Sequence, residues 1–407
     1  MSANDPGSTA AWRKIPRGVW VLGFVSLLMD ISSEMIHALL PVYLVVVLGT
    51  SALTVGIIEG IAESTAAIVK VFSGALSDWL GRRKLLAALG YGLAACTKPI
   101  FPLAVTVEWL IAARFIDRIG KGIRGAPRDA LVADLSPLHV RGASFGLRQS
   151  LDTVGAFLGP LLAIGLMWLT FDNFKLVFWI AVIPAFLAFG LIVTAVREPV
   201  HAEGPRPVRT PLSRLQLKSL GARYWWVVVI GAIFTLARFS EAFLVLRAQS
   251  IGLSLALVPL VLVVMNIAYA LVSYPAGVVS DRGNRLTILF FGLVVLVLAD
   301  LILSFASGIV GIMFGVLLWG VHMGLTQGLF AALVADSAPP ELRGTAYGFF
   351  NLVSGIMLLA ASVIAGILWD LTGPKGTFLA GASFAVLACI GLVPIRTHFA
   401  SQDMRKN

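Results

Sequence analysis

Apolar runs of about 20 residues recur along nearly the whole chain, separated by short segments that contain Gly, Pro or charged residues. A helix of that length is enough to cross the hydrocarbon core of a bilayer. The composition agrees, since 58% of the residues are hydrophobic and only 13% are charged. A typical soluble domain carries roughly 25% charged residues. The sequence therefore predicts an all-α integral membrane protein.

The breaks between the apolar runs predict twelve transmembrane helices. Their expected ranges are 17–47, 53–76, 84–105, 108–132, 141–169, 174–196, 223–248, 255–278, 285–306, 309–333, 343–369 and 375–396. The first run is long and is not followed by a small-residue cleavage site. We therefore expect it to remain as the first helix and not to be removed as a signal peptide.

The basic residues gather in alternate loops, which explains the net charge of +10 without a nucleic-acid partner. They are Arg13, Lys14, Arg17, Arg82, Arg83, Lys84, Arg128, Arg141, Arg206, Arg209, Arg214, Lys218, Arg282, Arg285, Arg343, Arg396, Arg405 and Lys406. Loops enriched in Lys and Arg remain on the cytoplasmic side of a membrane. This pattern predicts a multi-pass protein of a bacterial inner (plasma) membrane with both termini in the cytoplasm.

The chain contains an internal repeat. The only long polar interruption is rich in Pro and Arg, and it predicts an N-terminal six-helix lobe (1–196), a cytoplasmic linker (197–222) and a C-terminal six-helix lobe (223–407). The stretch "ALVADLSPLHVRGASFG" from Ala130 returns as "ALVADSAPPELRGTAYG" from Ala332, and "GALSDWLGRR" from Gly74 returns as "GVVSDRGNR" from Gly277. A weaker match aligns Glu34 with a carboxylate 207 residues later. Such repeats are typical of secondary transporters, whose substrates bind where the repeats meet.

Three motifs resemble those of the major facilitator superfamily, and with the length and topology the resemblance covers essentially the whole chain. "GALSDWLGRRK" resembles the loop signature between its second and third helices, and the matching residues are Gly74, Leu76, Asp78, Gly81, Arg82 and Arg83. Trp79 replaces the usual arginine of that signature. "RFIDRIGKG" resembles the helix 4 motif of proton-coupled members, with Arg114 in place and Asp117 and Arg118 where Gln and Gly are common. "GAFLGPLLAIG" resembles the helix 5 motif of drug/proton antiporters through Gly155, Gly159 and Pro160.

The resemblance implies two pseudo-symmetric six-helix lobes that work by alternating access around a cavity lined by helices 1, 4, 7 and 10. It also implies that Gly74, Asp78, Gly81, Arg82 and Arg83 form a conformational latch between the lobes.

Ionisable residues inside the predicted helices indicate a functional cavity, because each costs from about 2.5 kcal/mol upward at the membrane centre. Asp30, Glu34 and His37 share one face of the first helix, at spacings of four and three residues. The second helix carries Glu59 and Glu63, again four residues apart. The other candidates are Arg114, Asp117, Arg118, Asp152, Arg238, Glu241, Asn266, His322 and Gln327. We expect this set to bind the solute and handle the proton, with Glu34 or Asp30 as the proton carrier and Glu34 favoured.

Each group also has a purely structural interpretation. Glu59 and Glu63 could pair with basic residues of the fourth helix, and Arg148 could pair with Asp152 four residues on. Arg114 or Arg118 could form a static buried pair with a neighbouring carboxylate. Residues at the cytoplasmic end of the fourth helix favour an interfacial scaffold, namely Arg124, Arg128, Asp129 and Asp134.

These observations predict a monomeric secondary transporter, not an enzyme, that exports a small polar or charged organic solute in a proton-coupled manner. No nucleophile–base arrangement or phosphate-binding loop occurs in the sequence, and we expect no cofactor. The two cysteines, Cys96 and Cys389, lie in separate apolar helices and predict free thiols. Two alternatives remain open. One is a transporter of a transition metal or metal chelate, with Asp30, Glu34 and His37 as ligands. The other is a membrane sensor or scaffold that does not transport.

Overall fold

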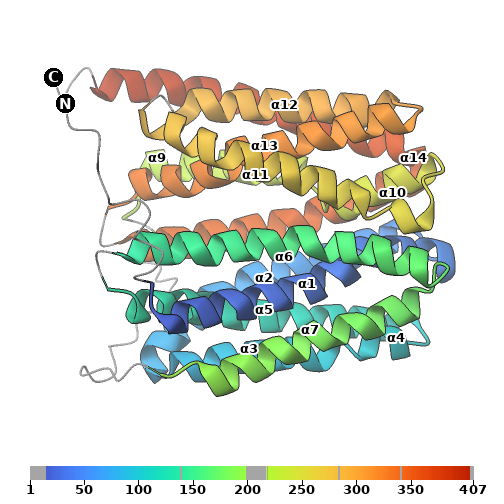
Figure 1. The fold of residues 1–407 in the computed structure, drawn as a ribbon. Coiled ribbons are helices and arrows are strands. Elements are labelled where there is room, and N and C mark those ends of the chain that lie inside the picture. Colours follow the sequence, from blue (N-terminus) through green and yellow to red (C-terminus); the bar gives the residue numbers. More distant parts are fainter. Residues whose placement is uncertain are drawn as a thin grey trace, which may run out of the picture. The chain divides into compact units, whose positions relative to one another are not determined.

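The structure, a computed structural model, describes residues 15–137, 140–198, 217, 219–282, 285–339 and 342–403. These residues form long helices joined by short connections, with no strand among them (Figure 1). In chain order the elements are α1 (Arg17–Val42), η2 (Tyr43–Val47), α2 (Ala52–Leu80), α3 (Arg83–Thr97), α4 (Ile100–Leu103), α5 (Val107–Leu135), α6 (Arg141–Leu169), α7 (Phe174–Ala195), α9 (Ala222–Ala237), α10 (Ala242–Ser250), η4 (Leu255–Leu257), α11 (Leu260–Arg282), α12 (Arg285–Phe305), α13 (Ile309–Ser337) and α14 (Arg343–Asp403). The predicted all-α membrane architecture is confirmed.

Ten helical segments of the described residues are long and apolar enough to cross a membrane. One of them, Thr345–Leu392, is 48 residues long and contains two of the expected helices. Gly373 separates these two, because its φ of 74° is incompatible with a continuous helix. The expected helix at 108–132 lies within α5, which carries too many charged residues to belong to the ten. The structure is therefore consistent with the twelve predicted helices.

The helices pack into two compact units. The first contains the described residues of Met1–His37 and Ile68–Arg209, and its buried core comes from α1, α3, α5 and α7. The second contains those of Ala38–Ala67 and Thr210–Asn407, and its core comes from α9, α12, α13 and α14. Within the second unit, α12 lies beside α13 and α14 (Figure 1). The predicted lobe boundaries remain a prediction, because the N-terminal half of α2, up to Ala67, belongs to the second unit by its contacts.

The contact between α2 and α14 explains this assignment. Asp370 of α14 accepts hydrogen bonds from the backbone N–H groups of Ala52 and Leu53, both at 3.0 Å. These amides belong to the first turn of α2, where no carbonyl of the helix itself can accept them. The backbones also approach closely, because a Cβ added at Gly56 would lie 2.2 Å from the carbonyl oxygen of Ser362. The first turn of α2 is therefore capped by a carboxylate more than 300 residues away.

The internal repeat is visible in the structure. Arg83 pairs with Asp134 in the first unit, and Arg285 pairs with Asp336 in the second, so that both partners are shifted by 202 residues. The extensive packing of α3 on α5 is likewise matched by that of α12 on α13. Residues separated by 202 positions can therefore be compared directly across these helices.

Candidate functional site

Two glycines of α6 bring that helix close to the face of α1 that carries Asp30 and Glu34. A Cβ added at Gly155 would lie 2.9 Å from Cβ of Asp30, and one added at Gly159 would lie 2.6 Å from Cβ of Glu34. Pro160 follows and is buried within α6. Atoms at these distances would have to shift, since carbon atoms prefer separations of about 3.5–4.0 Å. The predicted helix 5 motif therefore packs directly on the Cβ atoms of both candidate residues.

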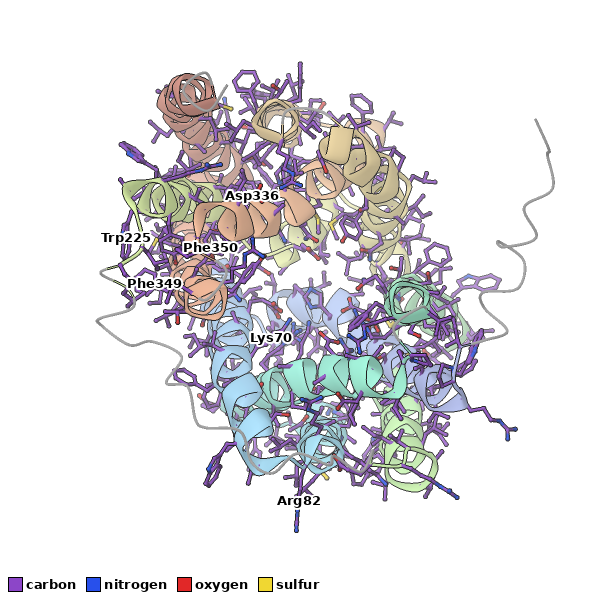
Figure 2. All side chains as sticks on the ribbon, turned by 90° about the vertical axis from the view of Figure 1, so that its left-hand side faces the viewer. Lys70, Arg82, Trp225, Asp336, Phe349 and Phe350 are labelled. Atoms are coloured by element: carbon purple, nitrogen blue, oxygen red, sulfur yellow. The ribbon has the colours of Figure 1, made fainter. Side chains whose placement is uncertain are left out.

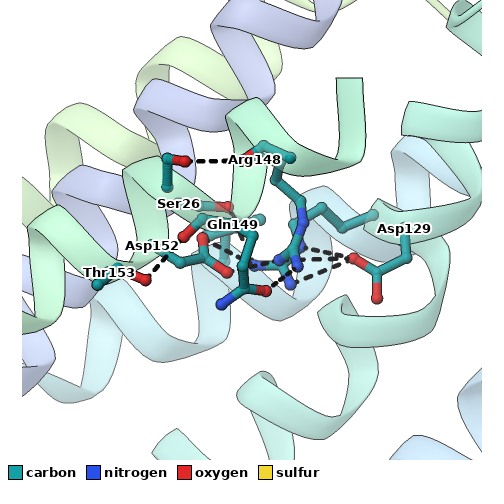
Figure 3. Close-up of polar contacts among 10 residues, drawn as sticks. Ser26, Asp129, Arg148, Gln149, Asp152 and Thr153 are labelled. Carbon is teal, nitrogen blue, oxygen red and sulfur yellow. Dashed lines mark hydrogen bonds and ion pairs between the residues drawn. The ribbon is translucent and has the colours of Figure 1, made fainter. Parts of the chain in front are cut away.

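A network of ion pairs lies beside Asp30 and joins α5 to α6 (Figure 3). Arg148 donates to Asp152 at 2.5 Å, and the same nitrogen lies 3.7 Å from Asp129. Arg128 lies 3.2 Å from Asp129 and 3.8 Å from Asp152. Asp30 interacts electrostatically with this network through Asp152 and Arg128. A carboxylate of α1 therefore interacts with one carboxylate and one arginine of this network.

Polar side chains fix the arginines of this network. Arg128 donates a hydrogen bond of 3.0 Å to the hydroxyl of Ser26, which lies 3.2 Å from the hydroxyl of Tyr91. Arg148 donates to the side-chain oxygen of Gln149 at 2.7 Å (Figure 3). Arg124 lies over the ring of Tyr91, 4.7 Å from its centroid. These contacts hold the basic groups in one arrangement around the carboxylates.

His37, at the far end of the same α1 face, contacts a different partner. Its Nδ1 lies 2.7 Å from a guanidinium nitrogen of Arg114, and both side chains are buried. A guanidinium can only donate, so His37 Nδ1 accepts, and a neutral imidazole then carries its proton on Nε2. Asp30 and His37 therefore interact with different arginines, Arg128 and Arg114.

Asp117 pairs with Lys98, which was not among the predicted site residues. Lys98 Nζ lies 2.9 Å from Asp117 and donates to the hydroxyl of Ser33 at 3.0 Å. Arg118 lies 3.9 Å from the other oxygen of Asp117. Lys98, Asp117 and Arg118 are all at most 2% exposed. This buried pair joins the end of α3 to the middle of α5.

The second unit holds another group of the predicted residues. Arg238 lies between α9 and α10, where the helix is interrupted, and interacts electrostatically with Glu241 and Glu63. Glu59 is buried at 1% exposure, and Asn266 of α11 is half-buried.

His322 supports the packing of α13 on α12. It is fully buried, and its Nδ1 lies 2.9 Å from the carbonyl oxygen of Gly292. Because a carbonyl oxygen can only accept, Nδ1 carries the proton in this hydrogen bond. The rings of Phe234 and Trp319 surround the imidazole, with centroids at 5.5 and 6.4 Å. The contacts of His322 are those of a helix-packing residue.

Gln327 lines two cavities within the second unit. One, of about 230 Å³, lies among α9, α13 and α14 and includes Arg238 in its lining. The other, of about 290 Å³, lies between α11 and α13 and includes Arg285 and Tyr269. The structure therefore brings together two residues, Arg238 and Gln327, that lie far apart in the sequence.

The predicted latch lies at the turn between α2 and α3. Gly81, with a φ of 62°, makes this turn, and Arg83 then begins α3 and pairs with Asp134. Arg82 is exposed and projects away from the helices (Figure 2).

Two latch residues lie in the last turns of α2. A Cβ added at Gly74 would lie 3.4 Å from Cβ of Ala126 in α5, an ordinary packing distance. The side chain of Asp78 lies outside the described residues. The latch remains a prediction.

Several residues of the site were not predicted from the sequence. Lys98 was visible as a charge in an apolar helix, but its partner was not. Arg148 pairs with Asp152, as its structural interpretation predicted, whereas the position of Arg128 near Asp152 was not predicted. Phe330 and Phe350 of the smaller cavity carried no signal of their own. The internal repeat could have identified them, because they occupy the positions equivalent to Arg128 and Arg148.

The metal site suggested as an alternative is not found in the part of the chain that the structure describes. There, no group of three or more His, Cys, Asp and Glu side chains is arranged to hold a metal ion. Asp30 and His37, two of the suggested ligands, contact different partners.

Comparison with known proteins identifies the family. A family model described as Major Facilitator Superfamily matches residues 22–362 and 241–402. An uncharacterized MFS-type transporter of Methanocaldococcus jannaschii is 33% identical over 385 residues, which cover 92% of this chain and 94% of the relative. The quinolone resistance protein NorA of Staphylococcus aureus is 26% identical over 218 residues, 54% of each chain.

A solved structure shares the fold. A variant of the nucleoside transporter NupG matches with a TM-score of 0.79 at 14% identity, over 93% of this chain and 99% of that chain. The family match, the relatives and the all-helical membrane fold of this chain show that it belongs to the major facilitator superfamily of membrane transporters.

Proposed function

We propose that this protein is a secondary active transporter that exports a small polar or charged organic solute by alternating access, in exchange for protons. The family supports transport, and a relative named as a quinolone resistance protein supports export. The proposal includes a bacterial inner membrane, a monomeric protein and cytoplasmic termini, as the distribution of Lys and Arg favours.

The electrostatic interaction of Asp30 with Asp152, together with the packing of Gly155 on Asp30 three residues further along α6, carries the proposal. Two neighbouring carboxylates repel each other when both are ionised, and adding a proton to either one removes that repulsion. A proton on Asp152 would also weaken its pairing with Arg148 and Arg128, which then turn toward Asp129. Protonation therefore changes which groups of α5 and α6 are bound to each other.

The close packing of α6 on α1 gives this change a mechanical consequence. Gly155 and Gly159 contact Asp30 and Glu34 without an intervening side chain. A movement of α6 on protonation of Asp152 is therefore passed directly to α1, because the two helices meet without an intervening side chain. This scheme places the proton on Asp30 and not on Glu34, which the sequence favoured, because Asp30 interacts electrostatically with Asp152 and Arg128.

Transport into proteoliposomes with an imposed pH gradient, over a panel of solutes, tests the proposal. We expect wild-type flux to follow the gradient, and Asp30→Asn to retain solute exchange while losing gradient-driven accumulation. Glu34→Gln tests in the same assay whether Glu34 carries the proton instead. Glu108→Gln, an exposed carboxylate at the start of α5, is the matched control and should behave as wild type. Flux that ignores the gradient in the wild type would overturn the coupling.

A further inference from the structure

The smaller cavity of the second unit has the features of a binding site. It measures about 230 Å³ and lies among α9, α13 and α14, with Ala67 of α2 at its edge. Sites for drug-sized ligands are commonly about 300–1,000 Å³. This cavity therefore fits a compact solute of one or two rings.

Three phenylalanines form one wall of the cavity. The rings of Phe234 and Phe330 are 4.7 Å apart, and those of Phe330 and Phe350 are stacked at 6.1 Å with an angle of 24° between their planes. Phe349, the neighbour of Phe350, packs against Trp225 instead, with ring centroids 5.3 Å apart (Figure 2). Phe330 and Phe350 both line the cavity, and a planar ring packs favourably against aromatic side chains.

The polar part of the lining is rich in hydrogen-bond donors. Arg238 is the one charged side chain that the structure describes in this lining, and Gln327, Asn351 and Ser354 lie around the same cavity. A guanidinium binds a carboxylate through two parallel hydrogen bonds, and this geometry is specific to planar anions. Amide and hydroxyl groups can donate further hydrogen bonds to oxygen substituents.

The internal repeat shows that this aromatic lining is particular to one half. The equivalents of Phe330 and Phe350 are Arg128 and Arg148, which belong to the ion-pair network of the first unit. The same helix positions hold a filled polar network in one unit and a cavity with stacked rings in the other. The cavity is therefore not a general consequence of the fold.

We propose that this cavity binds a small aromatic carboxylate, with its ring on Phe330 and Phe350 and its carboxylate on Arg238. The inference rests on the proposed function only in taking this acid as the transported solute. Arg238 also interacts electrostatically with Glu241 and Glu63, so the carboxylate of the solute competes with these two side chains for the guanidinium.

Equilibrium binding of radiolabelled benzoate to the purified full-length protein tests this inference without any proton gradient. Unlabelled benzyl alcohol lacks the anion and should compete about tenfold or more weakly than benzoate. Cyclohexanecarboxylate lacks the aromatic ring and should compete about three- to tenfold more weakly. If benzoate does not bind, or if the three compounds compete equally, the inference is overturned whatever the variants do.

Two variants then assign the contacts. Arg238→Gln should remove the preference for benzoate over benzyl alcohol, and Phe330→Leu should remove its preference over cyclohexanecarboxylate. Phe291→Leu, on an exposed position of α12, is the matched control and should leave both preferences unchanged. Unchanged preferences in both cavity variants would place the acid elsewhere.

The binding and transport experiments fail separately. Benzoate bound with this selectivity, but without gradient-driven flux, would retain the binding site and reject the proton coupling. Gradient-driven flux of another solute, without benzoate binding, would retain the proton coupling and reject the binding site.

Discussion

The two repeats use equivalent helix positions for opposite purposes. The equivalent pairs are Arg128 and Phe330, Arg148 and Phe350, Gln149 and Asn351, and Asp152 and Ser354. In the first unit these positions hold ion pairs, and in the second they line a cavity with aromatic rings. Equivalent helices therefore pack in the same way in both units, while the side chains between them are charged in one unit and mostly uncharged in the other.

A second equivalent position shows the same difference. Lys98 and Asp117 form a buried ion pair in the first unit, and their equivalents in the second are Asp300 and Trp319. Asp300 is fully buried, and neither of its oxygens has a hydrogen-bond partner among the described residues. One unit therefore satisfies its buried carboxylate with a lysine, whereas the other surrounds it with apolar groups.

Substitution of Lys98 should have the largest effect on the free energy of unfolding. Lys98→Met leaves Asp117 buried without its main partner, and we expect the free energy of unfolding to fall by about 3–5 kcal/mol. The double variant Lys98→Met with Asp117→Leu should recover most of this loss, because no unpaired charge remains. Thermal unfolding of the purified variants measures both. A double variant no more stable than the single one would show that the pair is not the source of the loss.

Substitution of Gly159 in α6 should have an intermediate effect on the free energy of unfolding. The position equivalent to Gly159 is Ala361 in the second half, so that Gly159→Ala places the second-half residue in the first. Its new Cβ would meet Cβ of Glu34 at 2.6 Å, and overpacking of this kind costs about 1–3 kcal/mol. Unfolding and gradient-driven flux should both be affected. Gly165→Ala is the control on the same helix, because no atom lies within 4 Å of its added Cβ; equal effects of the two substitutions would contradict this account.

Substitution of Asp300, the buried carboxylate of the second half, should have the smallest effect on the free energy of unfolding. An isolated charge in apolar surroundings is far costlier than the uncharged acid, which an amide resembles in shape. Asp300→Asn should therefore change the free energy of unfolding by less than about 1 kcal/mol. The same unfolding measurement serves here. A loss as large as that of Lys98→Met would mean that Asp300 depends on a charged partner, and the contrast between the units would disappear.

The positions of the helices could be predicted from the sequence because hydropathy acts locally. The ranges expected for the helices at 141–169 and 285–306 differ from α6 and α12 by at most one residue. The interruption between α9 and α10 was not predicted, since the residues around Arg238 contain no Gly or Pro to mark it.

The partners of the buried charges could not be predicted from the sequence. A spacing of three or four residues shows that Asp30, Glu34 and His37 share a face, but not what each one meets along a helix that passes several neighbours. Asp117 pairs with a residue 19 positions away at the end of α3, which only the packing of α3 on α5 determines. The aromatic cavity likewise depends on three helices meeting.

The cap on α2 differs from the other contacts in what evolution or design could change. Asp370 binds backbone amides, so among substitutions at Ala52 or Leu53 only proline would remove one of those donors. Substitutions other than proline can therefore weaken this contact directly only at Asp370. A protein engineer who wishes to bias how readily these two helix ends separate would have to begin at position 370.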